Sequence, residues 1–159
     1  MHNLFLVCPD CHLEQIIRKE FGSDSIFLTA LGAVFSLNTF EYVEIVNQTI
    51  VMEAIKHIYI VNDFSCMFLQ NATKNRITFD SIIGKSLYNL VNANRSIIEA
   101  FPDQDKQLIK LAELNIILQG KQLLEAPFIG TKVKQREIEL SGLIYNRKIN
   151  TFKSLQVHF

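Results

Sequence analysis

The sequence predicts an α/β fold, mainly a parallel sheet with flanking helices and a C-terminal strand pair. Short apolar runs alternate with segments whose apolar residues recur at helical spacing, and the tail changes to strand-like alternation. Strands that alternate with helices are joined by right-handed crossovers and lie parallel in the sheet. A length of 159 residues is typical of one domain, so we expect a single domain over 1–159.

The first part of the chain contains three apolar runs that end at turn signals. The expected buried strands are Asn3–Cys8, Ser25–Thr29 and His57–Val61. The segments between them carry apolar stripes at helical spacing, one from Leu13 to Phe21 and one from about residue 38 to Ile55. This order predicts two strand–helix–strand units.

The second part of the chain is expected to be helical before it returns to strands. Pro102 stops one helical stripe and Asp103 is suited to cap the next. Beyond residue 136 the apolar residues alternate with polar ones. The expected elements are a helix over 78–101, a helix over 103–124, and strands over 136–145 and 151–157.

Composition excludes several classes of protein. The 16 Lys and Arg residues balance 16 Asp and Glu residues, so no excess positive charge favours nucleic-acid binding. No apolar run approaches the ~18–20 residues of a membrane span, so no membrane association is expected. The start of the chain lacks a basic region and a cleavage site for secretion, and three cysteines are an odd number. We therefore predict a cytoplasmic protein.

Residues that bind metals follow two of the predicted strands. Cys8 and Asp10 come at the end of the first strand, and Asp63 and Cys66 come at the end of the third. In parallel sheets, ligands bind beyond the carboxyl ends of the strands. If the first and third strands are neighbours, these four side chains converge on one small site.

The cysteines are compatible with four interpretations. Residues 8–12 match the C-x-x-C-H pattern of haem attachment and contain the C-x-x-C pair of redox proteins. Two thiolates with carboxylates from two strand ends are also suited to tetrahedral zinc. Alternatively, Cys8 and Cys66 are small buried hydrophobic residues with no chemical role.

Taken together, these motifs resemble those of the β-class carbonic anhydrases. That family has C-x-D-x-R after its first strand and H-x-x-C after its third. Here the corresponding segments read Cys-Pro-Asp-Cys-His over 8–12 and Asp-Phe-Ser-Cys over 63–66. The segments 26–32 and 138–145 are similar to the family as well, so the resemblance spans nearly the whole chain.

The resemblance implies a tight homodimer with a zinc site near the dimer interface, and reversible hydration of carbon dioxide to bicarbonate. It implies that Cys8, Asp63 and Cys66 hold the zinc. It also implies that Asp10 orients the hydroxide on the metal, with His12 as the partner of Asp10.

Two residues depart from the family pattern at chemical positions. Asp63 stands where the family has His, and His12 stands where it has Arg. An anionic ligand makes zinc a weaker Lewis acid, and His holds a carboxylate less firmly than the Arg fork does. A zinc-dependent lyase with weakened activity therefore competes with a non-catalytic dimeric homologue that has a structural metal site or no metal. Thiol redox chemistry at Cys8 and Cys11 is a third hypothesis, and Cys11 could also replace a lost zinc ligand.

Overall fold

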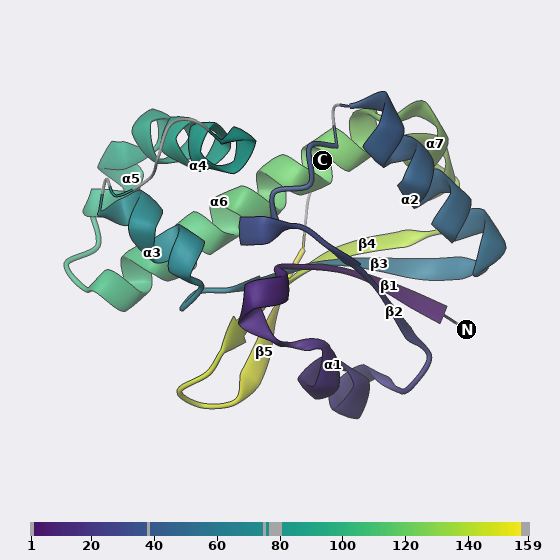
Figure 1. Cartoon of the computed structure of the whole chain (residues 1–159), viewed down its shortest axis with the longest axis horizontal. Helices are drawn as coiled ribbons and strands as arrows, with labels where there is room; N and C mark the ends of the chain where they lie inside the picture. Colours follow the sequence, from purple (N-terminus) through teal and green to yellow (C-terminus); the bar gives the residue numbers. More distant parts are fainter. Residues whose placement is uncertain (1, 38, 75, 77–80, 157–159) are drawn as a thin grey trace.

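The computed structural model describes residues 2–37, 39–74, 76 and 81–156. Its centre is a five-stranded sheet in the order β2-β1-β3-β4-β5 (Figure 1). The first four strands are parallel, and β5 pairs antiparallel with β4. The predicted fold class is confirmed. The strands are β1 (His2–Val7), β2 (Ser25–Thr29), β3 (Ile55–Asp63), β4 (Glu139–Asn146) and β5 (Thr151–Leu155).

Helices cover both faces of the sheet unequally. α1 lies on one face, whereas α2 and α6 lie on the other, and α6 continues into α7 (Figure 1). α3, α4 and α5 form a group at one end of α6 (Figure 1). The helices are α1 (Glu14–Phe21), α2 (Phe40–Met52), α3 (Met67–Thr73), α4 (Ile82–Ala93), α5 (Arg95–Glu99), α6 (Gln104–Glu125) and α7 (Pro127–Lys134). None of these helices is long and apolar enough to cross a membrane.

The helical part of the chain differs from the prediction in two respects. The single helix expected over 78–101 is divided into α4 and α5 at Asn94, whose side-chain amide donates to the Leu90 carbonyl at 2.9 Å. Asn competes with the helix for backbone hydrogen bonds, which explains the break. The short helices α3 and α7 were not predicted. Residues 78–80 and 157 of the expected elements lie outside the described residues.

The register of the sheet brings the ends of β1 and β3 together. β1 pairs parallel with β3, with Leu6 opposite Ile60, and both strands are largely buried. Central parallel strands are covered on both faces and are therefore rich in apolar residues. The turns that follow β1 and β3 consequently meet at one edge of the sheet, as the candidate site requires.

Candidate metal centre

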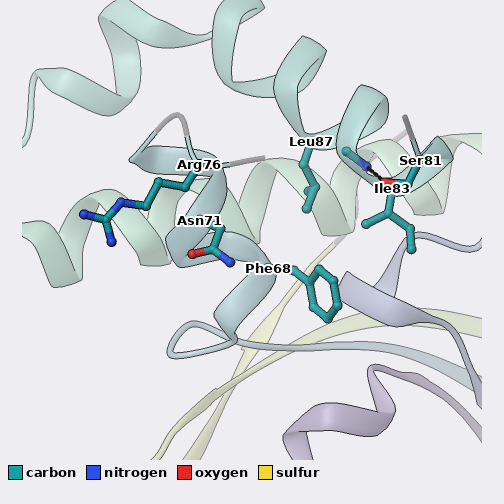
Figure 2. A pocket seen from close by; sticks show the side chains of 7 residues that line it. Phe68, Asn71, Arg76, Ser81, Ile83 and Leu87 are labelled. Carbon is teal, nitrogen blue, oxygen red and sulfur yellow. Dashed lines mark hydrogen bonds between the residues drawn. The ribbon is translucent and has the colours of Figure 1, made fainter. Parts of the chain in front are cut away.

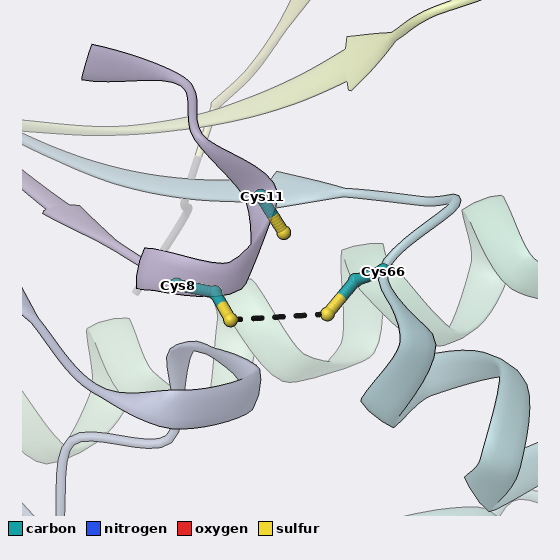
Figure 3. A group of neighbouring side chains, drawn as sticks. All are labelled: Cys8, Cys11 and Cys66. Atoms are coloured by element: carbon teal, nitrogen blue, oxygen red, sulfur yellow. Dashed lines mark hydrogen bonds between the residues drawn. The ribbon is translucent and has the colours of Figure 1, made fainter.

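Three cysteine sulfurs meet at the carboxyl ends of β1 and β3. Cys8 directly follows β1, Cys11 ends the 3-10 turn η1 (Pro9–Cys11), and Cys66 directly precedes α3. All three sulfurs lie within 4.8 Å of one another, and the Cys8 and Cys66 sulfurs are 3.9 Å apart (Figure 3). The three residues are at most 6% exposed. We call this group the cysteine cluster.

Local backbone geometry brings Cys11 back towards Cys8. Pro9 has its φ fixed by its ring and opens the 3-10 turn, in which the Cys11 amide donates to the Cys8 carbonyl at 3.2 Å. His12 then adopts a left-handed conformation with φ of 50°, which ends the turn. On the other side of the cluster, the Cys66 amide donates to the Asp63 carbonyl at 3.0 Å.

Backbone amides point at the sulfurs. The Gly32 amide donates to the Cys8 sulfur at 3.2 Å, and the Asp10 amide also bonds this sulfur. Gly32 lies in the turn η2 (Leu31–Ala33) with φ of +65°, where a side chain would be strained. The Phe68 amide bonds the Cys66 sulfur. Such donors stabilise a sulfur that carries negative charge.

The three thiols influence one another's pKa values. Hydrogen bonds from Cys11 and Cys66 lower the pKa of Cys8 against the opposing effect of burial, and the Gly32 and Asp10 amides lower it further. Hydrogen bonds to Cys66 and Cys8, together with burial, raise the pKa of the Cys11 thiol. The hydrogen bond with Cys11 lowers the pKa of Cys66, but the bond with Cys8 and burial outweigh it, and the pKa is raised. Burial opposes the ionisation of all three thiols, so a cation would be needed to stabilise three thiolates together.

A buried polar network supports the turn that contains Gly32. The side-chain amide of Asn115, on α6, donates to the Asn62 side chain at 3.0 Å and to the Gly32 carbonyl at 3.3 Å. Gln119, one turn later, accepts from the Phe35 amide at 2.9 Å. Buried polar groups need such partners. The network fixes η2 against α6 and thereby fixes the amide that faces Cys8.

Asp63 is close in sequence to the cysteine cluster but is not a member of it. Among the described residues, Cys8, Cys11 and Cys66 form the group of potential metal ligands. One carboxylate oxygen of Asp63 accepts from the Ser65 amide at 2.8 Å and from the Ser65 hydroxyl at 2.6 Å, and the other forms an ion pair with Arg147. The structure thus joins Cys8 and Cys66, as expected, but with Cys11 in the third place.

Asp10 and His12 lie at the surface. Both residues are exposed, whereas the cysteines on either side of them are buried. Within the described part of the chain, no hydrogen bond or ion pair connects the two side chains. The roles that the resemblance implies for Asp10 and His12 therefore stay predictions.

A small cavity lies between residues of α3 and α4, with Phe68 in its lining. It has a volume of about 100 Å³, and Phe68, Ile83 and Leu87 provide its apolar lining (Figure 2). A Cβ atom on Gly32 would lie 3.3 Å from both Phe68 and Ile83. The other lining residues are Asn71, Arg76, Ser81 and Gly84.

Sequence reasoning gave too little weight to two residues of this site. The sequence predicts Cys11 as a redox partner of Cys8 or as a substitute ligand, whereas the C-x-x-C spacing with Pro after the first Cys was the available signal for its place in the cluster. Arg147 belongs to a C-terminal third that contains several Lys and Arg residues, a pattern typical of a solvated surface. No local pattern connects Arg147 with residues 63 and 11, because the contact depends on the return of the β4–β5 hairpin.

The chain has the fold of the β-carbonic anhydrases. No family model and no curated protein matches its sequence. A tetrameric β-carbonic anhydrase from the ascomycete Sordaria macrospora matches with a TM-score of 0.81 and 16% identity, over 96% of this chain and 79% of that chain. Wild-type CafD, a β-carbonic anhydrase of Aspergillus fumigatus, matches with a TM-score of 0.82 and 13% identity, over 98% of this chain and 90% of its own. The β-carbonic anhydrase CcaA matches with a TM-score of 0.73 and 18% identity, over 97% and 79%. The resemblance in fold is confirmed.

Proposed function

We propose that the protein is a zinc-binding, carbonic-anhydrase-like protein in which Cys8, Cys11 and Cys66 hold the metal, and that it hydrates carbon dioxide slowly. The observation that carries this proposal is the mutual approach of three buried sulfurs to within 4.8 Å. The β-carbonic anhydrase fold of the solved structures supports the choice of reaction. This ligand set replaces Asp63 by Cys11.

The dimensions of the cluster fit zinc. A Zn–S distance of about 2.3 Å and tetrahedral angles require sulfurs about 3.8 Å apart. The Cys8 and Cys66 sulfurs are 3.9 Å apart, and the third sulfur is within 4.8 Å of both. Asp63 is already engaged by Ser65 and Arg147, so it does not compete for the ion. Three thiolates leave one tetrahedral position for a water molecule.

The same ligand set limits activity. When bound, zinc supplies a Lewis acid that acidifies a water molecule in the open position. Three thiolates give the site a formal charge of about −1, counting the deprotonated ligands that zinc requires, so this acidification is weaker than with two thiolates and a neutral His. Asp10 and His12, to which the resemblance gives the orienting role, are both exposed. We expect bicarbonate formation that is slow at neutral pH and faster at higher pH.

Metal analysis combined with X-ray absorption at the zinc edge tests the ligand set. We expect one zinc per chain with three sulfur ligands, and the loss of one sulfur in Cys11→Ser. Asp63→Asn is the matched comparison, because it should keep three sulfurs. A chain that retains no zinc, or a wild-type spectrum with two sulfurs that changes in Asp63→Asn, would overturn the proposal.

Stopped-flow hydration of carbon dioxide tests the activity separately. The zinc-loaded protein should exceed the buffer rate, and the excess should grow above the pH of ~7 at which efficient zinc hydratases ionise their water. A zinc-loaded protein with no rate above buffer would refute hydration and identify a non-catalytic homologue with a structural metal.

We also propose that the protein is a cytoplasmic homo-oligomer. The Sordaria macrospora relative in fold is tetrameric. In this chain α2 exposes large apolar side chains, with Phe40 and Met52 each 79% exposed, and these could pack against a second copy. Three reduced, buried thiols suit a reducing compartment. Light scattering during gel filtration tests the assembly, and a monomer at micromolar concentration would contradict it.

Thiol redox chemistry is a second candidate function. The 3.9 Å separation of the Cys8 and Cys66 sulfurs favours it, because small movements would bring them to bonding distance. Two thiols would lose two protons and two electrons to hydrogen peroxide, giving one disulfide and two waters. Thiol titration of the metal-free protein after peroxide treatment should then find one free thiol per chain. Three free thiols would exclude the disulfide.

A further inference from the structure

Arg147 connects the β4–β5 hairpin to both cysteine loops. It follows directly after β4, far along the sequence from the cysteines. Its guanidinium group forms an ion pair with Asp63 and donates a hydrogen bond to the Cys11 carbonyl. One side chain thus touches the loop that contains Cys11 and the turn that leads to Cys66.

Asp63 connects Arg147 to the backbone of Cys66. Its side chain is 1% exposed, and it holds the Ser65 amide and hydroxyl. The backbone carbonyl of the same residue accepts from the Cys66 amide at 3.0 Å. A buried carboxylate is costly without a paired charge, and removal of its partner is strongly destabilising. Arg147 therefore stabilises the turn that places the Cys66 sulfur.

The hairpin holds Arg147 in place. The ring of Tyr145 is buried and lies 5.8 Å from the guanidinium carbon. The Tyr145 hydroxyl donates to the Asn150 side chain at 2.6 Å, which closes the hairpin. Lys148 forms an ion pair with Asp105 at the start of α6. These contacts make the hairpin a fixed support.

The geometry points to Arg147 as the positioning residue that holds the Cys11 and Cys66 sulfurs at the spacing a metal ion needs. The role rests on the proposed zinc site, but the contacts through which it acts belong to the metal-free chain. An Arg side chain suits this position because its planar fork can serve a carboxylate and a carbonyl together, whereas Lys presents a single charged point. This role differs from the one that the resemblance implies for His12, which is to pair with Asp10, and it comes from the other end of the chain.

Zinc affinity, measured by competition with a chromophoric chelator, tests the inference. Arg147→Gln should weaken zinc binding about 10- to 100-fold, the usual effect of losing a group that orients a ligand. Arg147→Lys should recover part of the loss because it restores the charge opposite Asp63. Arg95→Gln is the matched control: Arg95 pairs with Glu99 on α5 and is similarly exposed, so the affinity should stay within about twofold.

A second measurement keeps the test independent of the metal. In the metal-free protein, Arg147→Gln should react faster with a thiol reagent than wild type, since the loops that bury the cysteines are no longer tied. Circular dichroism verifies that the variant is folded. If wild type binds no zinc while thiol reactivity rises in Arg147→Gln, the proposed function fails and the positioning role remains. If zinc affinity and thiol reactivity of Arg147→Gln both match wild type, the inference is wrong.

Discussion

The two ends of the sheet carry different potential metal ligands, and these ligands are arranged differently at each end. At the carboxyl ends, three cysteines converge in a buried cluster. At the amino ends, His57 lies 3.3 Å from Glu139, and His2 lies 3.5 Å from Glu53. These are conventional metal ligands, yet within the described residues they meet only in pairs, and Glu139 is 77% exposed.

The difference shows that position in the fold matters more than residue type. Turns after parallel strands can fold over one another at the carboxyl edge, where backbone amides also face the ligand. At the amino ends, His57 and Glu139 lie on neighbouring strands and Glu53 lies in the turn before β3, so these residues form two separate pairs. We propose the metal at the carboxyl ends because, among the described residues, three potential ligands meet there.

The largest expected effect is the loss of zinc when a cysteine at the carboxyl end is removed. Cys66→Ser should weaken zinc binding by more than the roughly 100-fold upper range for orienting residues, because a ligand itself is lost. His57→Ala, at the amino end, should retain wild-type affinity. Equilibrium dialysis with elemental analysis measures both. Equal losses of zinc affinity in the two variants would show that the two ends of the sheet do not differ in zinc binding.

A smaller effect is expected from Gly32, which presents its amide to Cys8. Gly32→Ala places a side chain at φ of +65° and a Cβ atom 3.3 Å from Phe68 and Ile83. We expect a loss of about 1–3 kcal/mol in the free energy of unfolding, measured with urea, because the backbone is strained there. Zinc binding should weaken as well, because the Cys8 sulfur loses the alignment of its donor.

Gly22 provides the comparison at the amino end of the sheet. It lies just before β2 with φ of +106°, and a Cβ atom there meets no atom within 4 Å. Gly22→Ala should therefore destabilise the fold through backbone strain but leave zinc affinity unchanged. If Gly22→Ala weakened zinc binding as much as Gly32→Ala, the effect of Gly32 would be a general consequence of instability.

The sequence predicted the convergence of Cys8 and Cys66 because that inference needs only strand order and direction. The apolar runs identified β1 and β3, and parallel neighbours place their ends together. The identity of the third member of the cluster depends on a single turn of 3-10 helix, which directs Cys11 inward and leaves Asp10 and His12 outside. Such a turn follows from packing around Pro9 rather than from periodicity.

Local sequence patterns could not predict the partner of Asp63, for a different reason. Strand-like alternation predicted the C-terminal strand pair, and the antiparallel pairing of β4 with β5 agrees with it. That pattern does not specify which residue of the turn points back across the sheet. Arg147 and Lys148 are adjacent in sequence, yet Arg147 meets a buried carboxylate and Lys148 meets an exposed one. The two residues differ in importance because the partner of Arg147 is buried and the partner of Lys148 is exposed. The sequence does not reveal this difference in burial.

The smallest expected effect is on the pH dependence of stability at the amino end. Burial lowers the pKa of His57, and the charge of Glu139 partly opposes this. Below the usual histidine pKa of about 6.5, the unfolded chain binds a proton that the folded His57 resists, so stability falls as pH falls. His57→Gln should therefore lose less stability than wild type between pH 8 and pH 5, measured as urea midpoints.

Glu139→Gln sharpens this test because it should change the pH dependence in the opposite direction. Without the carboxylate, nothing offsets burial, so the pKa of His57 falls further and the loss of stability at pH 5 grows. If the fold holds His57 neutral, the loss of stability of wild type at pH 5 should therefore lie between the losses of the two variants. Parallel pH profiles for all three proteins would show that His57 is as well solvated in the folded protein as in the unfolded chain. The amino end of the sheet would then hold a solvated His57–Glu139 pair, in greater contrast to the buried cysteine cluster at the carboxyl end.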